Sequence, residues 1–180
     1  ARMSITAFEN LMSAAERRML MSGEKNTCIR MSDFLGTIPA INGKVELVYE
    51  GEQEGAEQVS FYLINQAVKT LFPAYFPEIK KLEKQDEEGP YDHLLEWFYG
   101  DNELFLEDNL PDNVYHDTLM NVPNLKKLIA TYQADCPRED LFFMMEFLLW
   151  GLEANKKLNK YRTMEGFQFK DGLGNLLAGI

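Results

Sequence analysis

Apolar residues near the start of the chain recur at the spacing of an amphipathic helix. Thr6 followed three residues later by Glu9 is the pattern of a capping box, and Gly23 is suited to end a helix. Between these signals, Arg17 and Arg18 fall mostly off the apolar stripe. The pattern predicts a helix that begins near Thr6, ends at Gly23 and buries one face. The stripe consists of Phe8, Leu11, Met12, Ala15 and Met19.

A second helix is predicted to begin at Ser32, whose hydroxyl is suited to cap it. Pro39 lies too far into this segment to occupy its first turn, so we expect a kink or an early end there. Residues 44–50 then alternate between apolar and polar side chains, which is compatible with a strand. The acidic, glycine-containing stretch at 50–55 follows, and it is the predicted boundary between two units.

The rest of the chain, residues 51–180, has the pattern of a second helical unit. Its most hydrophobic segment, 141–158, is apolar on nearly every side, so we expect this helix at the centre of a bundle. The tail at 161–180 mixes aromatic residues with glycines, which indicates irregular structure or a short strand plus a turn. The predicted fold class is mainly α, with at most a short strand or hairpin. Further helices are predicted at 57–72, 77–82, 90–99, 103–107, 112–120 and 124–133.

Composition and charge narrow the classes of function. With 46% hydrophobic residues the chain can bury a substantial core. The net charge of −11 argues against a nucleic-acid or anionic-membrane surface, because both need clustered positive charge. The apolar run at 141–152 contains Glu146 and is shorter than the ~20 residues of a membrane span. Cys28 and Cys136 have no metal-ligand spacing, so we expect two free thiols in a cytoplasmic protein.

The glycine-rich segments and the histidines do not match known site motifs. Six residues separate Gly36 from Gly43, whereas a phosphate loop has four, and Val45 stands where that loop has Ser or Thr. His93 and His116 have neither a Glu three residues before them nor a second His four residues on. No serine or cysteine nucleophile motif is present either. We therefore predict no catalytic residue and no metal site in this chain.

Several short segments before residue 56 match one protein family. They are Ala1-Arg2, the segment 10–18 (NLMSAAERR), Ser32-Asp33-Phe34, Ile38-Pro39-Ala40-Ile41 and the segment 43–55 (GKVELVYEGEQEG). With these segments, residues 1–50 resemble the helical lid of AAA+ ATPases, in the branch of the magnesium chelatase ATPase subunit and the MoxR-like proteins. Residues 56–180 resemble the C-terminal extension of the same group more loosely.

The resemblance implies that the full-length protein is a ring-forming ATPase that uses ATP and magnesium ion. Residues 1–50 are then an AAA+ lid-like helical subdomain, and 51–180 are a helical C-terminal extension. Arg2 takes the sensor-2 position, where its guanidinium contacts a nucleotide phosphate held by an N-terminal AAA+ core. The chain has no Walker A lysine and no acidic Walker B motif. On this interpretation it is not catalytic and binds no cofactor alone.

The resemblance also implies the partners and the task. The partners are the N-terminal core, the neighbouring subunits of the ring, and a protein substrate or cochaperone, with no nucleic acid and no membrane. The task is to couple ATP binding and hydrolysis to remodelling of that partner. A free-standing helical protein–protein interaction module is the alternative, and an all-helical enzyme that uses paired carboxylates is a third hypothesis. A Walker A motif encoded upstream of Ala1 would distinguish the first from the second.

Overall fold

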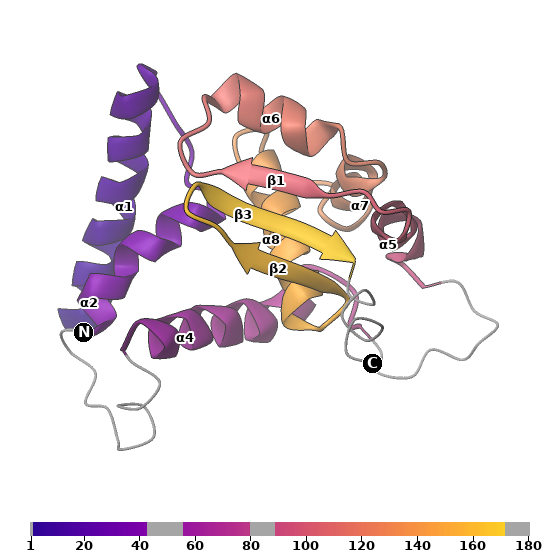
Figure 1. Cartoon of the computed structure of the whole chain (residues 1–180), viewed down its shortest axis with the longest axis horizontal. Helices are drawn as coiled ribbons and strands as arrows, with labels where there is room; N and C mark the ends of the chain where they lie inside the picture. Colours follow the sequence, from indigo (N-terminus) through magenta and orange to yellow (C-terminus); the bar gives the residue numbers. More distant parts are fainter. Residues whose placement is uncertain (1, 43–55, 80–88, 172–180) are drawn as a thin grey trace.

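The computed structural model describes residues 2–42, 56–79 and 89–171 of the chain. Over these residues the protein is mainly α-helical with a small three-stranded antiparallel sheet, which confirms the predicted fold class. Figure 1 shows α1 at one end of the molecule and α8 behind the sheet. Among the described helices, none is both long enough and apolar enough to cross a membrane.

The helix at the centre of the molecule is α8, Leu141–Ala154, in which every residue from Met144 to Leu152 is buried. A helix with apolar side chains on all sides has to be surrounded. The surrounding elements are α4, α6, α7, β2 and the 3-10 helix η1, all of which contact α8. The predicted central helix is thus confirmed. We call residues 56–79 and 89–171 the body. The bounds of its other helices are Ala56–Leu71 for α4, Phe72–Ala74 for the 3-10 helix η2, Asp92–Tyr99 for α5, Asp112–Met120 for α6 and Leu125–Tyr132 for α7.

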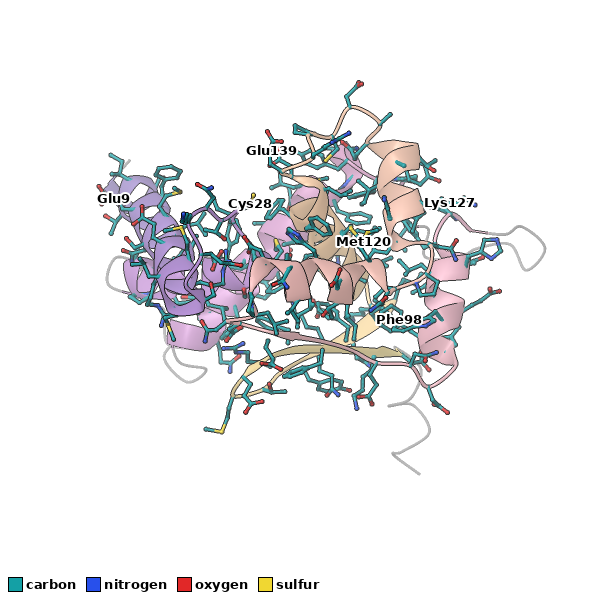
Figure 2. The ribbon with its side chains drawn as sticks, turned by 90° about the horizontal axis from the view of Figure 1, so that it is seen from above. Glu9, Cys28, Phe98, Met120, Lys127 and Glu139 are labelled. Atoms are coloured by element: carbon teal, nitrogen blue, oxygen red, sulfur yellow. The ribbon has the colours of Figure 1, made fainter. Side chains whose placement is uncertain are left out.

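The sheet covers one side of α8. Leu104 and Leu106 of β1 pair with Phe169 and Phe167 of β3, and all four side chains are buried, whereas the alternate residue Gln168 is half-buried. This alternation is what a strand with one face on the core requires. Figure 2, which views the sheet nearly edge-on, shows the helices on one side of it. The strands are β1 (Leu104–Glu107), β2 (Leu158–Arg162) and β3 (Gly166–Asp171), in the order β1-β3-β2 with antiparallel pairing throughout.

Two sequence predictions in this body are wrong. The segment 103–107 is not a helix but contains β1, because its leucines alternate at the period of a strand and pair with β3. The helix predicted over 141–158 ends at Ala154, because Lys156 has a positive φ of 62° and turns the chain into β2. The helices predicted at 57–72, 90–99, 112–120 and 124–133 are confirmed to within two residues at each end. Residues 77–79 are not helical, and 80–82 lie outside the described residues.

The N-terminal unit packs on this body. It consists of α1 (Arg2–Ser22), η1 (Met31–Thr37) and α2 (Ile38–Asn42). Gly36 lets α1 and η1 come close, since a Cβ there would lie 2.7 Å from the Cβ of Ala14. Met31 is buried in the main core, and Phe34 and Ile38 pack against it. The N-terminal unit therefore shares its core with residues 56–79 and 89–171. The strand predicted at 44–50 and the boundary predicted at 50–55 lie outside the described residues.

In the N-terminal unit the helix caps and the proline lie at other positions in the helices than predicted. The first helix begins at Arg2, so Thr6 lies inside it and cannot be its cap. The N-cap of η1 is Arg30, and Ser32 lies within that 3-10 helix. Pro39 does lie in a first turn, because the segment changes from 3-10 to α-helix at Ile38. The expected kink at the proline is thus a change of helix type.

The contact between η2 and α8 depends on Gly151. A Cβ at this position would overlap the ring of Phe72, which is 1% exposed and has no space to move away. Phe72 also contacts the rings of Phe76, Tyr91 and Phe147, so its position is fixed from several sides. Because Gly151 has no side chain, the ring of Phe72 in η2 can pack directly against the backbone of α8.

We expect Gly151→Ala to destabilise the protein by about 1–3 kcal/mol, although alanine favours a helix, because the added methyl group overpacks the core. The free energy of unfolding in urea is the measurement. The control is Gly100→Ala, where the nearest atom to a new Cβ is 3.4 Å away and little change is expected. A Gly151→Ala protein as stable as the wild type would contradict the packing of Phe72 on α8.

Candidate functional site

The predicted nucleotide contact, Arg2, is the first residue of α1. It therefore lies within the helix and not before it. Its side chain lies outside the part of the chain that the structure describes. The assignment of its guanidinium to a nucleotide phosphate stays a prediction.

One row of α1 leaves apolar side chains exposed. Ile5, Phe8 and Met12 are all exposed, with Phe8 at 62%. The predicted buried stripe is therefore wrong for Phe8 and Met12. Their spacing of three and four residues puts them on neighbouring turns of one side of the helix. Leu11 and Ala15, on the side that packs against the 3-10 helix η1 and α2, are buried. We call Ile5, Phe8 and Met12 the apolar row of α1. Such a row is a candidate contact surface.

Arg18 joins the buried side of α1 to η1. Its Nε and Nη2 donate to Oδ1 and Oδ2 of Asp33 at 3.1 and 2.8 Å, and both side chains are buried. Two further hydrogen bonds go from Arg18 to Thr27 Oγ1 and to the carbonyl of Cys28. Burial lowers the pKa of Arg18, but the hydrogen bond and charge of Asp33 outweigh it, so the net pKa is raised. The guanidinium is therefore held charged in a fork-to-fork pair.

Asp112 extends this contact to α6. Its Oδ1 accepts hydrogen bonds from Nη2 of Arg30 and, at 3.5 Å, from Nη1 of Arg18. The backbone N–H of Asp112 donates to the carboxylate of Glu24. Because Asp112 is the first residue of α6, that N–H has no acceptor within its own helix. The connection after α1 thus supplies the missing acceptor for α6.

Glu146 extends the contact to the central helix. It is 1% exposed and accepts hydrogen bonds from the backbone N–H of Met31 at 2.9 Å and from the hydroxyl of Tyr115 at 2.8 Å. The guanidinium of Arg30 lies over the Tyr115 ring, 4.0 Å from its centroid. Burial raises the pKa of Glu146, and the two hydrogen bonds and Arg30 only partly offset it. The carboxylate is thus tied to η1 through Met31 and to α6 through Tyr115.

These contacts form one assembly, which we call the buried polar network. It connects α1, η1, α6 and α8 through hydrogen bonds between side chains and backbone. Within the described residues, Nε and Nη1 of Arg30 are buried without a hydrogen-bond partner. A bidentate pair with buried partners fixes orientation as well as distance. The arrangement holds the N-terminal unit in one position on the body. The members of the network are Arg18, Arg30, Asp33, Asp112, Tyr115 and Glu146.

The histidines and cysteines do not gather into a site within the described residues. His93 lies near Glu96 on an exposed surface, and His116 stacks on Phe142 with ring centroids 3.6 Å apart. Burial lowers the pKa of His116. Cys28 and Cys136 are both free thiols, as predicted. Across 2–42, 56–79 and 89–171, no group of three His, Cys, Asp or Glu is placed to hold a metal ion.

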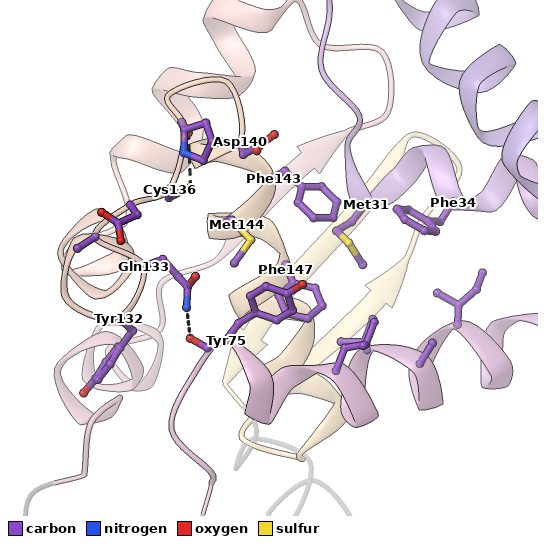
Figure 3. A pocket seen from close by; sticks show the side chains of 17 residues that line it. Met31, Phe34, Tyr75, Tyr132, Gln133, Cys136, Asp140, Phe143, Met144 and Phe147 are labelled. Atoms are coloured by element: carbon purple, nitrogen blue, oxygen red, sulfur yellow. Dashed lines mark hydrogen bonds between the residues drawn. The ribbon is translucent and has the colours of Figure 1, made fainter.

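An apolar pocket of about 630 Å³ lies between η1, α4, the N-terminal half of α8 and the connection before α8. In Figure 3, Met31 and Phe34 of η1 lie on one side of it, and Gln133 lies on the opposite side. Met144 and Phe147 of α8 lie between them. The amide of Gln133 donates to the carbonyl of Tyr75, which ties the end of α7 to the turn after η2.

No protein-family model matches the chain, and neither the curated proteins nor the solved structures gave a match.

Sequence reasoning missed the residues of the buried polar network. Arg18 was placed mostly off the apolar stripe, yet it follows Leu11 by seven residues and Ala15 by three, which is the spacing of one helix face. Glu146 was noted only as an interruption of the apolar run 141–152. A single charge inside such a run is itself a signal, because a buried carboxylate needs partners.

We expect Arg18→Ala to destabilise the protein by about 3–5 kcal/mol, because it leaves the buried carboxylate of Asp33 without its partner. Arg17→Ala is the matched control, since Arg17 is the preceding residue of the same helix and is exposed. That control should change stability by less than about 0.5 kcal/mol. Urea denaturation of both variants checks this. Equal losses for the two arginines would contradict the buried pair.

We expect Glu146→Gln to change how stability depends on pH. The folded chain holds the Glu146 proton above the pH at which the unfolded chain releases it, so wild-type stability falls as pH rises through this window. Glutamine cannot titrate, so the stability of the variant relative to the wild type should be higher at about pH 8 than at about pH 5. Denaturation at both pH values measures this. Glu16→Gln, on the exposed side of α1, is the control, and a pH-independent difference for Glu146→Gln would refute the assignment.

Proposed function

We propose that the chain is the C-terminal part of an AAA+ ATPase of the magnesium chelatase ATPase-subunit and MoxR-like branch. In this proposal residues 1–50 are the lid and 51–180 the helical extension, and the full-length protein works in the cytoplasm. The lid and extension couple ATP binding and hydrolysis to remodelling of a partner protein. The sequence resemblance of the first 55 residues is one support, and the way the N-terminal unit is held on the body is the other.

The observation that carries the proposal is the bidentate pair between Arg18 and Asp33. A lid that turns when nucleotide binds moves a partner only if the lid and the extension turn together. The pair fixes α1 on η1, while Asp112 and Glu146 tie that unit to α6 and α8. A sliding or hinged contact would absorb the rotation. The buried polar network supports a rigid link that transmits it.

The apolar row of α1 supports the place of the N-terminal core. Ile5, Phe8 and Met12 are exposed on the helix that begins at Arg2. A lid has to pack on the core that holds the nucleotide, and exposed apolar side chains in a row suit such a contact. The proposal therefore assigns this row to the contact between lid and core.

ATP and magnesium ion belong to the full-length protein in this proposal. The nucleotide supplies the phosphoryl group, and Arg2 is the residue of this chain assigned to contact it. Within the described residues no group of acidic and histidine ligands is placed to hold a metal ion. The proposal accordingly assigns magnesium to the N-terminal core. Neighbouring subunits of the ring and a protein substrate or cochaperone complete the set of partners.

A free-standing helical interaction module is the second candidate. The apolar pocket on α4 and α8 favours it, because a partner protein can bind in such a pocket. The coding sequence upstream of Ala1 discriminates between the two. The ATPase proposal expects a glycine-rich loop followed by lysine and Ser or Thr there. An upstream sequence without that motif would contradict the ATPase proposal and favour the interaction module.

In the full-length protein, Arg2→Ala should lower kcat for ATP hydrolysis by about tenfold or more, because it removes a charge that stabilises the transferring phosphoryl group. Arg17→Ala is the matched control on the exposed side of the same helix and should leave kcat unchanged. Steady-state ATPase assays give the rates, and thermal unfolding of both variants shows that the fold is kept. Unchanged turnover in Arg2→Ala would rule out the role assigned to this residue.

A further inference from the structure

The apolar pocket on α4 and α8 has an unequal distribution of charge. Most of its wall is apolar, with Val68, Met144 and Phe147 among its buried residues. Leu71 and Tyr75, at the end of α4 and just after it, remain 52% and 42% exposed. Large apolar side chains that stay exposed beside a pocket indicate a surface meant to be covered.

The charged groups of the pocket lie in the connection before α8. Asp135 and Asp140 are its charged lining residues within the described chain, and both are acidic. Both are exposed, and no ion pair or side-chain hydrogen bond within the described chain engages either carboxylate. The thiol of Cys136 lies between them in sequence, and its pKa is raised by burial and then by Asp140 and Glu139. The connection 135–140 carries three carboxylates and one guanidinium, that of Arg138, so this end of the pocket has a net negative charge.

We propose that the pocket binds a short amphipathic helix of a partner protein, which places apolar side chains on Met144 and Phe147 and a Lys or Arg beside Asp135 and Asp140. The volume of about 630 Å³ is enough for several large side chains. A groove between packed helices is the usual receptor for such a segment. The two methionines of the wall, Met31 and Met144, can adapt to different apolar side chains.

The charge of the protein favours a basic partner over a second copy of this chain. With a net charge of −11, two copies repel each other, whereas a basic segment is attracted to the acidic end of the pocket. The inference does not depend on the ATPase proposal, because η1 and the body form this pocket whether or not the chain belongs to an ATPase, and no residue of α1 lines it.

The test starts with a phage-displayed library of random peptides of about 14 residues, near the shortest length that forms a helix in water. The library is selected on the 180-residue chain without nucleotide. We expect the enriched peptides to have Leu, Phe or Met at helical spacing, with Lys or Arg next to that row. The best peptide is then synthesised with a fluorescent label, and its Kd is measured by anisotropy.

Two variants locate the binding site of the selected peptide. Ala67→Trp fills the pocket from the exposed side of α4 and should raise Kd at least about tenfold. The double variant Asp135→Asn/Asp140→Asn should raise Kd about threefold to tenfold and weaken its dependence on salt. The matched control removes two exposed carboxylates from α1, Glu9→Gln/Glu16→Gln, and should leave Kd unchanged.

A chemical footprint gives an independent readout. In a Cys28→Ser background, the selected peptide should slow alkylation of Cys136, which lines the pocket. Circular dichroism checks that Ala67→Trp is folded. The exposed Asp135→Asn/Asp140→Asn variant keeps the test decisive if Ala67→Trp does not fold.

Three results would overturn the inference. The first is enrichment of peptides without basic residues, and the second is binding that neither pocket variant weakens. The third is a dimer of the chain in sedimentation that Ala67→Trp disrupts, which would assign the pocket to a second copy. Since no ATP is present, each result leaves the assay of Arg2→Ala turnover untouched, and the two proposals can fail separately.

Discussion

The structure depends on one buried ion pair. Arg18 and Asp33 lie on different helical segments, are both buried, and satisfy each other through two parallel hydrogen bonds. Two charges out of water are tolerated only when their geometry is good and their other donors are bonded. For Arg18 the remaining acceptors are Thr27, the Cys28 carbonyl and Asp112. The path of the chain after α1 follows from this requirement, because residues 27–33 must wrap around the guanidinium.

The contact of η1 with the central helix follows directly after this segment. Met31 enters the main core immediately after Arg30, and its N–H meets the buried carboxylate of Glu146 on the central helix. The 3-10 helix η1 is thereby held against α8 and forms one side of the apolar pocket. The segment that the buried polar network holds on α8 is therefore also a wall of the proposed peptide site. A partner seated there would be carried by the same rigid unit.

Long segments with a strong apolar period were predictable from the sequence, and contacts between distant segments were not. The central helix 141–154 and α4 stand out because their length leaves no other interpretation. The four residues of β1 are too few to separate a helix from a strand until β3 pairs with them. The network joins Arg18 to Asp112, 94 residues later, and no local pattern reports such a pairing. Arg18 and Glu146 were nevertheless visible as charges at buried positions.

Native-state hydrogen exchange of the 180-residue chain tests the central claim most directly. If the buried polar network makes the N-terminal unit and the body one rigid unit, the amides of α1 around Arg18 open with the same free energy as those of α8. Their exchange then also has the same dependence on denaturant as that of α8. The account would be contradicted if the amides of α1 opened at a much lower free energy than those of α8. Their opening free energy would then depend little on denaturant, while α8 stayed protected.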